Sequence, residues 1–572
     1  MRRRLLVRHF LNQFVENDLA PDVDRHQILA VAAATLITVP LFATIFMSVK
    51  YLMQPLQSPG WTEITTMGDQ MIFCATSLLV SAVIATLEWD ALALSPRDSV
   101  ILGVLPLPRE EIVRAKVQAL VTFAAAFVIS LNALPTLLHP PLTVANFSGN
   151  PLLLVPLVLA HAVSTGMAGA FGFACVVALR EVLFLCLGER TFSRIAGTIR
   201  SGLLFSFLVL LVLAPIRLSG PTTWMLEPGK GPLFLQPVSW FVATHAVLAG
   251  RVLDILPTPN LPERLSAEEN RLRTQYRRGL PHLTSLALRG IGVFAVVLTI
   301  SISAYLRNAR RFHLLPEGQD TNKVLGVSRI SDAIASILTS KPATRAGLLF
   351  LIRTVAGNPS HRVYVTAFVA TGLALLITLA PDALFAPRGD RPIAISELVA
   401  QTLMLTAIVA GFRAAIRTSA DTRAAWVFGI AETSNHGEFR KGVRLGVISA
   451  VVATVLSLFP LYAAAWGVSG AAGHGIIGIA LGWLLVEVGS ANIEQPLVST
   501  IPPSDGLNTV GVVLLGATVI VVLVLGAIER AALTTFAGTA AFAATLLVAA
   551  AAVRYFGERN HRAVAISQGL VR

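Results

Sequence analysis

The sequence predicts an all-α, polytopic membrane protein that crosses a bilayer about twelve times. Of its 572 residues, 54% are hydrophobic and only 13% are charged, whereas a soluble globular chain carries about 25% charged residues. Apolar runs recur along the whole chain, and they have the roughly 20-residue length that a helix needs to cross hydrocarbon. Helices are expected because lipid offers the backbone no hydrogen-bond partners, so each spanning segment must satisfy its own.

The first half of the chain, residues 1–312, begins with a basic amphipathic segment and then contains six apolar runs that fit membrane spans. The stretch at 231–250 is also apolar, but it contains Pro237 and is short for a crossing. We therefore expect it to be re-entrant or interfacial. The six expected spans of this half cover residues 28–49, 70–87, 117–138, 152–179, 200–216 and 284–306.

The second half, residues 344–572, repeats this organisation after a stretch at 313–343 with the composition of a cytoplasmic linker. It too begins with an amphipathic basic segment, and in both halves a charged loop follows the second span. Repetition of this kind predicts two six-helix pseudo-repeats. The expected spans of the second half cover residues 363–380, 395–412, 443–465, 474–491, 508–528 and 533–553.

The formal net charge of +13 reflects membrane topology rather than a nucleic-acid partner. Lys and Arg accumulate in cytoplasmic loops of membrane proteins, and in a twelve-span arrangement most of the 45 Lys and Arg fall on one side. The basic stretch from Arg251 to Arg289 is the exception. We expect a multi-pass protein of the cell membrane, the inner membrane of a bacterium, with both termini cytoplasmic and with no nucleic-acid partner.

The two charged loops are candidate docking elements. The first, at 87–117, brackets an apolar patch with turn residues, so it can form a short helix along the membrane surface; an ordinary solvated loop is the alternative interpretation. The second, at 412–443, has the same position in its half. The expected polar contacts are Arg97, Asp98, Arg109, Glu110 and Glu111 in the first loop and Asp421, Arg423 and Glu432 in the second; the apolar patch is Ile101, Leu102, Val104 and Leu105.

Three sequence segments carry a resemblance to a known class. SPRDSVILGVLPLPREEIVRAKV contains a short polar turn, then LP, then a basic residue that enters the third span, while FLIRTVAGNPSHR and QPLVSTIPPSDGLN lie in the second half. The chain resembles the membrane (permease) subunit of ABC exporters, in a fused, double-length bacterial form. The loop that ends near Asp505 departs from the pattern because it contains no Lys or Arg.

The resemblance implies that separate ABC-type ATPase subunits hydrolyse ATP and push on the two loops. The chain itself lacks a GxxxxGK[ST] phosphate-binding loop. We expect the glycine cluster at 467–475 to be a tight external turn between spans nine and ten. The sequence contains no HExxH or GxSxG constellation, and its cysteines lack metal-ligand spacing. We assign no catalytic residue, cofactor or metal, and we expect no enzymatic activity in this chain; the three cysteines are Cys74, Cys175 and Cys186.

Ionisable residues at bilayer depth are functional candidates by default. His161 and Glu487 lie in equivalent spans of the two halves and form a possible intramembrane polar site, although hydrogen-bonded packing is an alternative role for His161. Glu397 and Glu529 are expected to reach the membrane interface. This scarcity of internal carboxylates argues against a secondary transporter but does not exclude a facilitator of a neutral substrate. A secondary transporter or facilitator stays the main alternative to an ATP-driven permease. A membrane-embedded transferase that uses the loop at 251–278 is a third possibility. The transported substrate is unknown.

Overall fold

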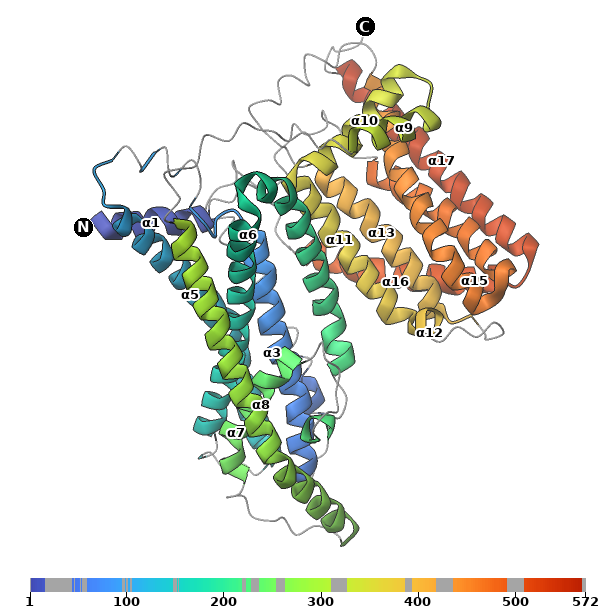
Figure 1. Ribbon diagram of the computed structural model, residues 1–572. Helices are drawn as coiled ribbons and strands as arrows, with labels where there is room; N and C mark the ends of the chain where they lie inside the picture. Colours follow the sequence, from blue (N-terminus) through green and yellow to red (C-terminus); the bar gives the residue numbers. More distant parts are fainter. Residues whose placement is uncertain are drawn as a thin grey trace. The chain divides into compact units, whose positions relative to one another are not determined.

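The computed structural model describes residues 2–15, 44–45, 47–51, 53, 59–94, 98, 101–102, 105–147, 152, 154–218, 223–227, 236–253, 263–309, 327–385, 393–417, 436–490 and 509–567 (Figure 1). Within these ranges every regular element is a helix, so the predicted all-α class is confirmed. Eight of the helices in these ranges are long and apolar enough to cross a membrane. The protein is therefore a helical membrane protein.

The chain divides into two compact units. The first comprises Met1–Leu203 and Leu213–Asp320, and the second comprises Leu204–Val212 and Thr321–Arg572. Four of the expected spans of the first half lie within helices of that half, and the span at 152–179 does so from Leu154 onward, whereas most of the expected span at 28–49 lies outside the described residues. The elements of the first half are α1 (Arg2–Val15), α3 (Pro59–Leu87), α5 (Arg109–Phe147), α6 (Leu154–Leu218), η2 (Thr223–Leu226), α7 (Gln236–Leu253) and α8 (Glu263–Ala309).

Helix α6 is a hairpin of two arms. It contains 65 residues, which at 1.5 Å per residue is about three times the thickness of hydrocarbon. At Gly188 the backbone leaves the helical region (φ 70°, ψ 166°), a conformation that residues with a Cβ rarely adopt. Phe184 and Phe192, four residues before and after the break, pack edge to face with ring centroids 5.4 Å apart. The chain therefore reverses at a single residue (Figure 1).

The apolar stretch at 231–250 contributes most of α7. Pro237 lies in the first turn of this helix, where its missing N–H interrupts no hydrogen bond. Phe241 and Val242 are fully buried, and α7 packs against α3 and α8. Helix α8 has 47 residues and is about 70 Å long, so it extends well beyond a 30 Å hydrocarbon layer.

The second half consists of shorter helices and one more hairpin. The six expected spans of this half coincide closely with α11, both arms of α15, α13, α16 and α17, and α9 lies inside the stretch that the sequence marks as a linker. The elements are α9 (Val327–Leu338), α10 (Pro342–Gly357), α11 (Pro359–Leu379), α12 (Pro381–Phe385), α13 (Ile395–Arg417), α15 (His436–Ser490), α16 (Thr509–Ala532) and α17 (Phe536–Ser567).

The α15 hairpin turns at Gly467 (φ 80°, ψ 166°). Val451 packs directly on Gly482 and Val455 packs on Gly478, so the two arms are antiparallel. The expectation of a turn over the whole of 467–475 is wrong in extent, because the chain is helical again from residue 468. The remaining glycines of this cluster serve packing; a Cβ added at Gly473 would contact Leu533 of the segment between α16 and α17.

Close contact between α3 and α6 depends on Gly172. A Cβ built at this position would lie 2.2 Å from the carbonyl oxygen of Leu78, which is backbone and cannot turn away. We expect Gly172→Ala to lower the free energy of unfolding by about 1–3 kcal/mol, the usual range for overpacking. Gly166→Ala, in the same arm with nothing within 4 Å of the new Cβ, is the matched control. Thermal unfolding of the purified variants in detergent measures both; equal melting temperatures would contradict the contact.

Candidate functional site

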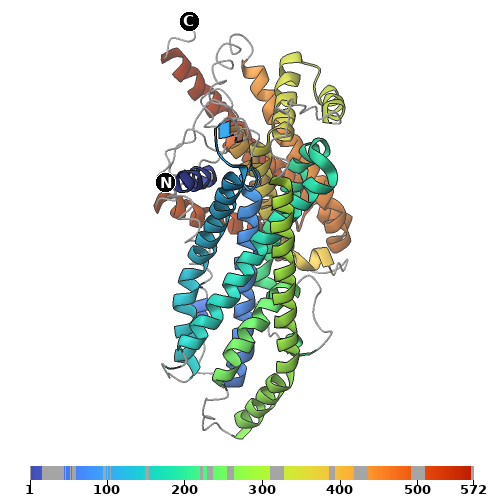
Figure 2. The ribbon, with the colours of Figure 1, turned by 60° about the vertical axis from the view of Figure 1, so that its left-hand side comes forward.

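At one end of the first unit, the amphipathic helix α1 lies against the start of α5 (Figures 1 and 2). Leu6 and Phe10 of α1 are buried in a cluster with Ile112 and Ala115 of α5. Lys116 of α5 is fully buried, and its Nζ donates to Gln13 Oε1 over 2.7 Å. The ammonium also faces the rings of Phe10 and Phe14 at 4.8 and 5.2 Å. Apolar packing and a cation–π contact thus fix α1 to α5.

The first candidate docking loop is tied to this assembly through Asp98. The Asp98 side chain is buried, accepts a hydrogen bond from Gln13 Nε2 over 2.6 Å, and lies 3.6 Å from His9 Nε2. Since Gln13 bonds both Asp98 and Lys116, it bridges the loop and α5. Asp98 therefore faces α1, rather than the outward direction that a docking contact needs.

The other predicted polar residues of this loop differ in their surroundings. Arg109 donates from Nε and Nη2 to the carbonyl of Ala309, at the end of α8. Glu110 is exposed and pairs with Arg114 over 3.0 Å, while Glu111 is half-buried. Arg97 lies outside the described residues. Of this set, Glu110 is the residue most accessible to another protein.

The apolar patch of the loop is divided. Leu102 is buried against α1 and α5, whereas Ile101 and Leu105 are 59% and 47% exposed; Val104 lies outside the described residues. One side of the patch therefore anchors the loop, and the other side stays available for a partner.

In the second unit, the amphipathic helix α10 packs on the start of α15 in a comparable way. A Cβ built at Gly347 would lie 2.1 Å from the Phe439 carbonyl oxygen, so the two helices are in backbone contact. Thr344 Oγ1 donates to Glu438 Oε2 over 3.0 Å. The loop that precedes α15 holds the predicted contacts Asp421, Arg423 and Glu432, and all three lie outside the described residues.

At its opposite end, the first unit buries a polar cluster around His161. His161 Nδ1 is 2.8 Å from Gln70 Oε1, and Gln70 Nε2 donates to Ser164 Oγ over 2.8 Å. The rings of His139 and His245 lie beside His161, with centroids 5.3 and 6.5 Å away. In the described part of the chain, no group of His, Cys, Asp or Glu has the geometry of a metal site.

A buried ion pair lies at the same end of this unit. Lys50 Nζ is 2.6 Å from Asp69 Oδ1, and the side chains are 22% and 1% exposed. Tyr51, next to Lys50, is buried with its ring 5.8 Å from that of His139. Lys50 follows the first expected span and Asp69 precedes the second. Opposite charges at adjoining span ends are the signal from which the sequence could have indicated this pair.

The second unit buries its own polar cluster. His474 Nδ1 lies 2.5 Å from Glu529 Oε1, and Trp466 Nε1 donates to Glu397 Oε2 over 3.0 Å. Glu397 and Glu529 are only 2% and 3% exposed. Both carboxylates are thus enclosed by the protein, because indole and imidazole groups of the α15 hairpin cover and bond them.

Glu487 lies near the last residue of α15, far along the second arm from His474. Its Oε2 is 3.3 Å from Arg444 Nη1, and its Oε1 accepts a hydrogen bond from Trp483 Nε1 over 3.3 Å. His161 is instead close to the first residue of its arm, as His474 is. His161 and Glu487 belong to different units, and within its own unit each occupies a different kind of position and belongs to a different set of contacts.

The Lys50–Asp69 pair generates a stability prediction. Asp69→Asn leaves a mostly buried ammonium without its counterion, which we expect to lower the free energy of unfolding by about 3 kcal/mol. Lys50→Met combined with Asp69→Asn removes both charges and should recover most of that loss. Melting temperatures in detergent test this, with the exposed Glu110→Gln as control. If the double variant melts at a lower temperature than Asp69→Asn alone, the loss of the counterion of Lys50 does not explain the destabilisation.

Comparison with known proteins identifies no relative of this chain. No protein-family model matches the sequence, and neither a curated protein nor a solved structure matches it. A functional assignment therefore rests on the residues and contacts described above: two amphipathic helices, each fixed to the helix that follows a charged loop, and two buried polar clusters at the other ends of the units.

Proposed function

We propose that this chain is the transmembrane permease component of an ATP-driven ABC export system, energised by separate nucleotide-binding subunits. In this proposal it spans the inner membrane of a bacterium twelve times, as two six-helix repeats, and both termini are cytoplasmic. The observation that carries the proposal is that Asp98 and Leu102 of the first loop contact α1 and α5, while Arg109, the first residue of α5, bonds the end of α8.

The geometry of that loop suits the transmission of force. Asp98 and Leu102 fix it to α1 and α5, so a displacement of the loop must move the helices below it. Ile101 and Leu105 remain exposed on its outer side and can fill an apolar groove of a partner, in the way that short amphipathic segments dock. We call these two exposed side chains the docking ridge. An ATPase that closes on nucleotide would push on the docking ridge.

Two parallels between the units support the repeat. In each unit an amphipathic helix packs against the start of the helix that follows the charged loop: α1 on α5 and α10 on α15. In each, a glutamine of the second expected span bonds a histidine residue of the fourth. Gln70 pairs with the His161 ring, and Gln401 Nε2 donates to the His474 carbonyl over 3.5 Å. His474, rather than Glu487, is the counterpart of His161 in this proposal.

The proposal predicts an ATPase partner that depends on the exposed ridge. Affinity capture of the tagged chain from gently solubilised native membranes should recover, in stoichiometric amount, a cytosolic ATPase with a phosphate-binding loop. Ile101→Glu combined with Leu105→Glu should reduce its recovery at least tenfold, because two charges then replace apolar contacts. Thermal unfolding should be unchanged, since both side chains are exposed.

Ile337→Glu provides the matched control, because Ile337 is an exposed aliphatic residue, 83% accessible, on α9 outside both loops. Its capture of the ATPase should equal that of the wild type. Recovery of the chain alone after mild crosslinking would rule out the permease assignment; equal recovery with the Ile101 and Leu105 variant would rule out the docking ridge.

The buried ion pairs favour a second candidate, a secondary transporter. Carboxylates that exchange partners or protons inside the membrane are the usual basis of ion coupling, and Asp69 and Glu529 are both buried and paired.

If the chain is a secondary transporter, the chain alone, in ATP-free proteoliposomes loaded with a small-molecule cell extract, should release a component when a pH gradient is imposed. Mass spectrometry of the released material tests it, and both Asp69→Asn and Glu529→Gln should abolish release. Release that requires ATP and the partner ATPase would exclude it.

A further inference from the structure

The histidine cluster of the first unit contains two nitrogen atoms that are buried and not bonded. His139 and His161 are 2% and 0% exposed, and in the part of the chain that the structure describes the Nε2 atom of each has no hydrogen-bond partner. Nearly all buried polar atoms of folded proteins are hydrogen-bonded, and an exception costs stability. Two exceptions on adjacent rings therefore indicate a site rather than ordinary packing.

The hydrogen bonds around His161 determine which of its two ring nitrogens carries the proton. Ser164 Oγ donates its one proton to the His161 carbonyl over 3.0 Å, so it accepts from Gln70 Nε2. This orients the Gln70 amide with Oε1 toward the imidazole, 2.8 Å from Nδ1. A carboxamide oxygen is an acceptor, so His161 Nδ1 is the donor. In the neutral ring, Nε2 is then a buried base that still has its lone pair.

The ring of His139 lies next to this base. Its centroid is 5.3 Å from that of His161, and the two planes are tilted by 34°. Phe73 of α3 contacts both rings, with centroids 4.8 and 5.2 Å away, so an aromatic side chain covers the pair. The two rings are near enough for one proton to join them, directly or through one bridging water molecule. A single added proton can therefore satisfy both unbonded nitrogens.

The other titratable or charged groups around the pair come from three further segments, and they are Lys50 and Tyr51 before α3, Asp69 of α3 and His245 of α7. The Tyr51 ring is 5.8 Å from that of His139, and the His245 ring is 6.5 Å from that of His161. Lys50, which is 22% exposed, pairs with Asp69. These groups form a line from the partly exposed Lys50 to the two imidazoles, along which a proton can reach them from the surface.

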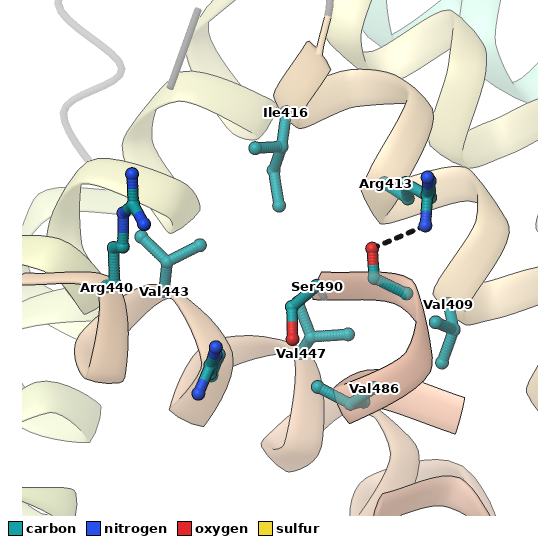
Figure 3. A pocket seen from close by; sticks show the side chains of 10 residues that line it. Val409, Arg413, Ile416, Arg440, Val443, Val447, Val486 and Ser490 are labelled. Carbon is teal, nitrogen blue, oxygen red and sulfur yellow. Dashed lines mark hydrogen bonds between the residues drawn. The ribbon is translucent and has the colours of Figure 1, made fainter. Parts of the chain in front are cut away.

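The pocket at the ends of the α15 hairpin differs in kind from this cluster (Figure 3). The described residues that line it include no histidine and no carboxylate. Arg413 Nη1 donates to the Gly489 carbonyl over 2.7 Å, and Arg444 pairs with Glu487. Guanidinium groups stay protonated in proteins, so the lining of this pocket does not titrate near neutral pH. A site for a proton is therefore sought in the histidine cluster.

We propose that His139 and His161 form a proton-binding site, in which one added proton is held on His161 Nε2 and shared with His139. The proton comes from water and no other group is released. The Nδ1–H bond to Gln70 persists, because that nitrogen already carries a proton. Imidazole is the side chain whose charge ordinarily changes between about pH 5 and 8, and an ionisable group at bilayer depth is a functional candidate. The site needs no ATPase and does not rest on the permease function proposed above.

Solid-state NMR of the full-length protein in lipid bilayers tests the site. Histidine is labelled with nitrogen-15 and glutamine with carbon-13, since the nitrogen spectrum separates a bare imidazole nitrogen from a protonated one. The His161 ring is identified by its contact with the Gln70 carboxamide. A His9→Asn background removes the contact between the His9 and Gln13 side chains. At about pH 8, Nδ1 of His161 should be protonated and Nε2 bare; by about pH 5, Nε2 should be protonated.

Two further results are expected from the same titration. The signals of His139 and His161 should change with one common midpoint, because coupled groups titrate as a pair. His139→Asn should weaken proton binding at His161 about tenfold, a shift of about one pH unit, because the second ring no longer shares the charge. His282→Asn is the control, since it removes a half-buried imidazole of α8 that none of these contacts involves; the midpoint should not change.

Three outcomes overturn the proposal. If Nε2 of His161 is still bare at about pH 5 in protein with an unchanged backbone spectrum, the imidazoles are neutral packing groups. If His139→Asn leaves the titration of His161 unchanged, the two rings do not share a proton. If stoichiometric Zn²⁺ binding replaces the titration of Nε2, the rings belong to a metal site instead. Should His139→Asn fail to fold, the wild-type curves decide: a common midpoint supports the shared proton, and independent midpoints contradict it.

Discussion

Hydrocarbon offers no hydrogen-bond partner to a peptide group, and this constraint determines how the chain is built. Each crossing must be helical, and each change of direction must leave the fewest unsatisfied amides. In α6 and α15 the chain reverses at one glycine, Gly188 or Gly467, whose positive φ is open to a residue without a side chain. Small residues then let the helices approach until backbone meets backbone, as Gly172 does with Leu78.

Polar side chains follow the same constraint. A charge taken out of water must find a partner, and in the described part of the chain Lys50 finds Asp69, Arg444 finds Glu487 and His474 finds Glu529. These pairs join different helices or different arms of a hairpin. They restrict how those segments can slide along each other, which pure hydrocarbon packing would permit. Polar contacts therefore constrain the register of the helices that they join.

Much of this architecture could be predicted from the sequence, because hydropathy directly reports the length and position of spanning helices. The sequence also predicts the amphipathic segments that form α1 and α10. Side-chain partners were not, because a pair such as Glu397 with Trp466 depends on which helices become neighbours. For the same reason Asp98, polar and next to a turn, was expected to face a partner protein, yet it is buried against Gln13. A hydropathy scale gives every carboxylate the same polar value, because it takes no account of the neighbours that the fold provides.

The one-residue turn at Gly467 has a mechanical consequence for the second unit. A long loop between two helices can change its conformation and so absorb a displacement of one helix, whereas a turn at a single residue cannot. The two arms of the 55-residue hairpin are therefore expected to move together as one rigid element. The two ends of the hairpin meet in the Arg444–Glu487 pair, and His474 lies just beyond the turn at its other end. The His474–Glu529 contact and the Arg444–Glu487 pair are therefore held at a fixed separation, near the turn and near the ends of the same hairpin.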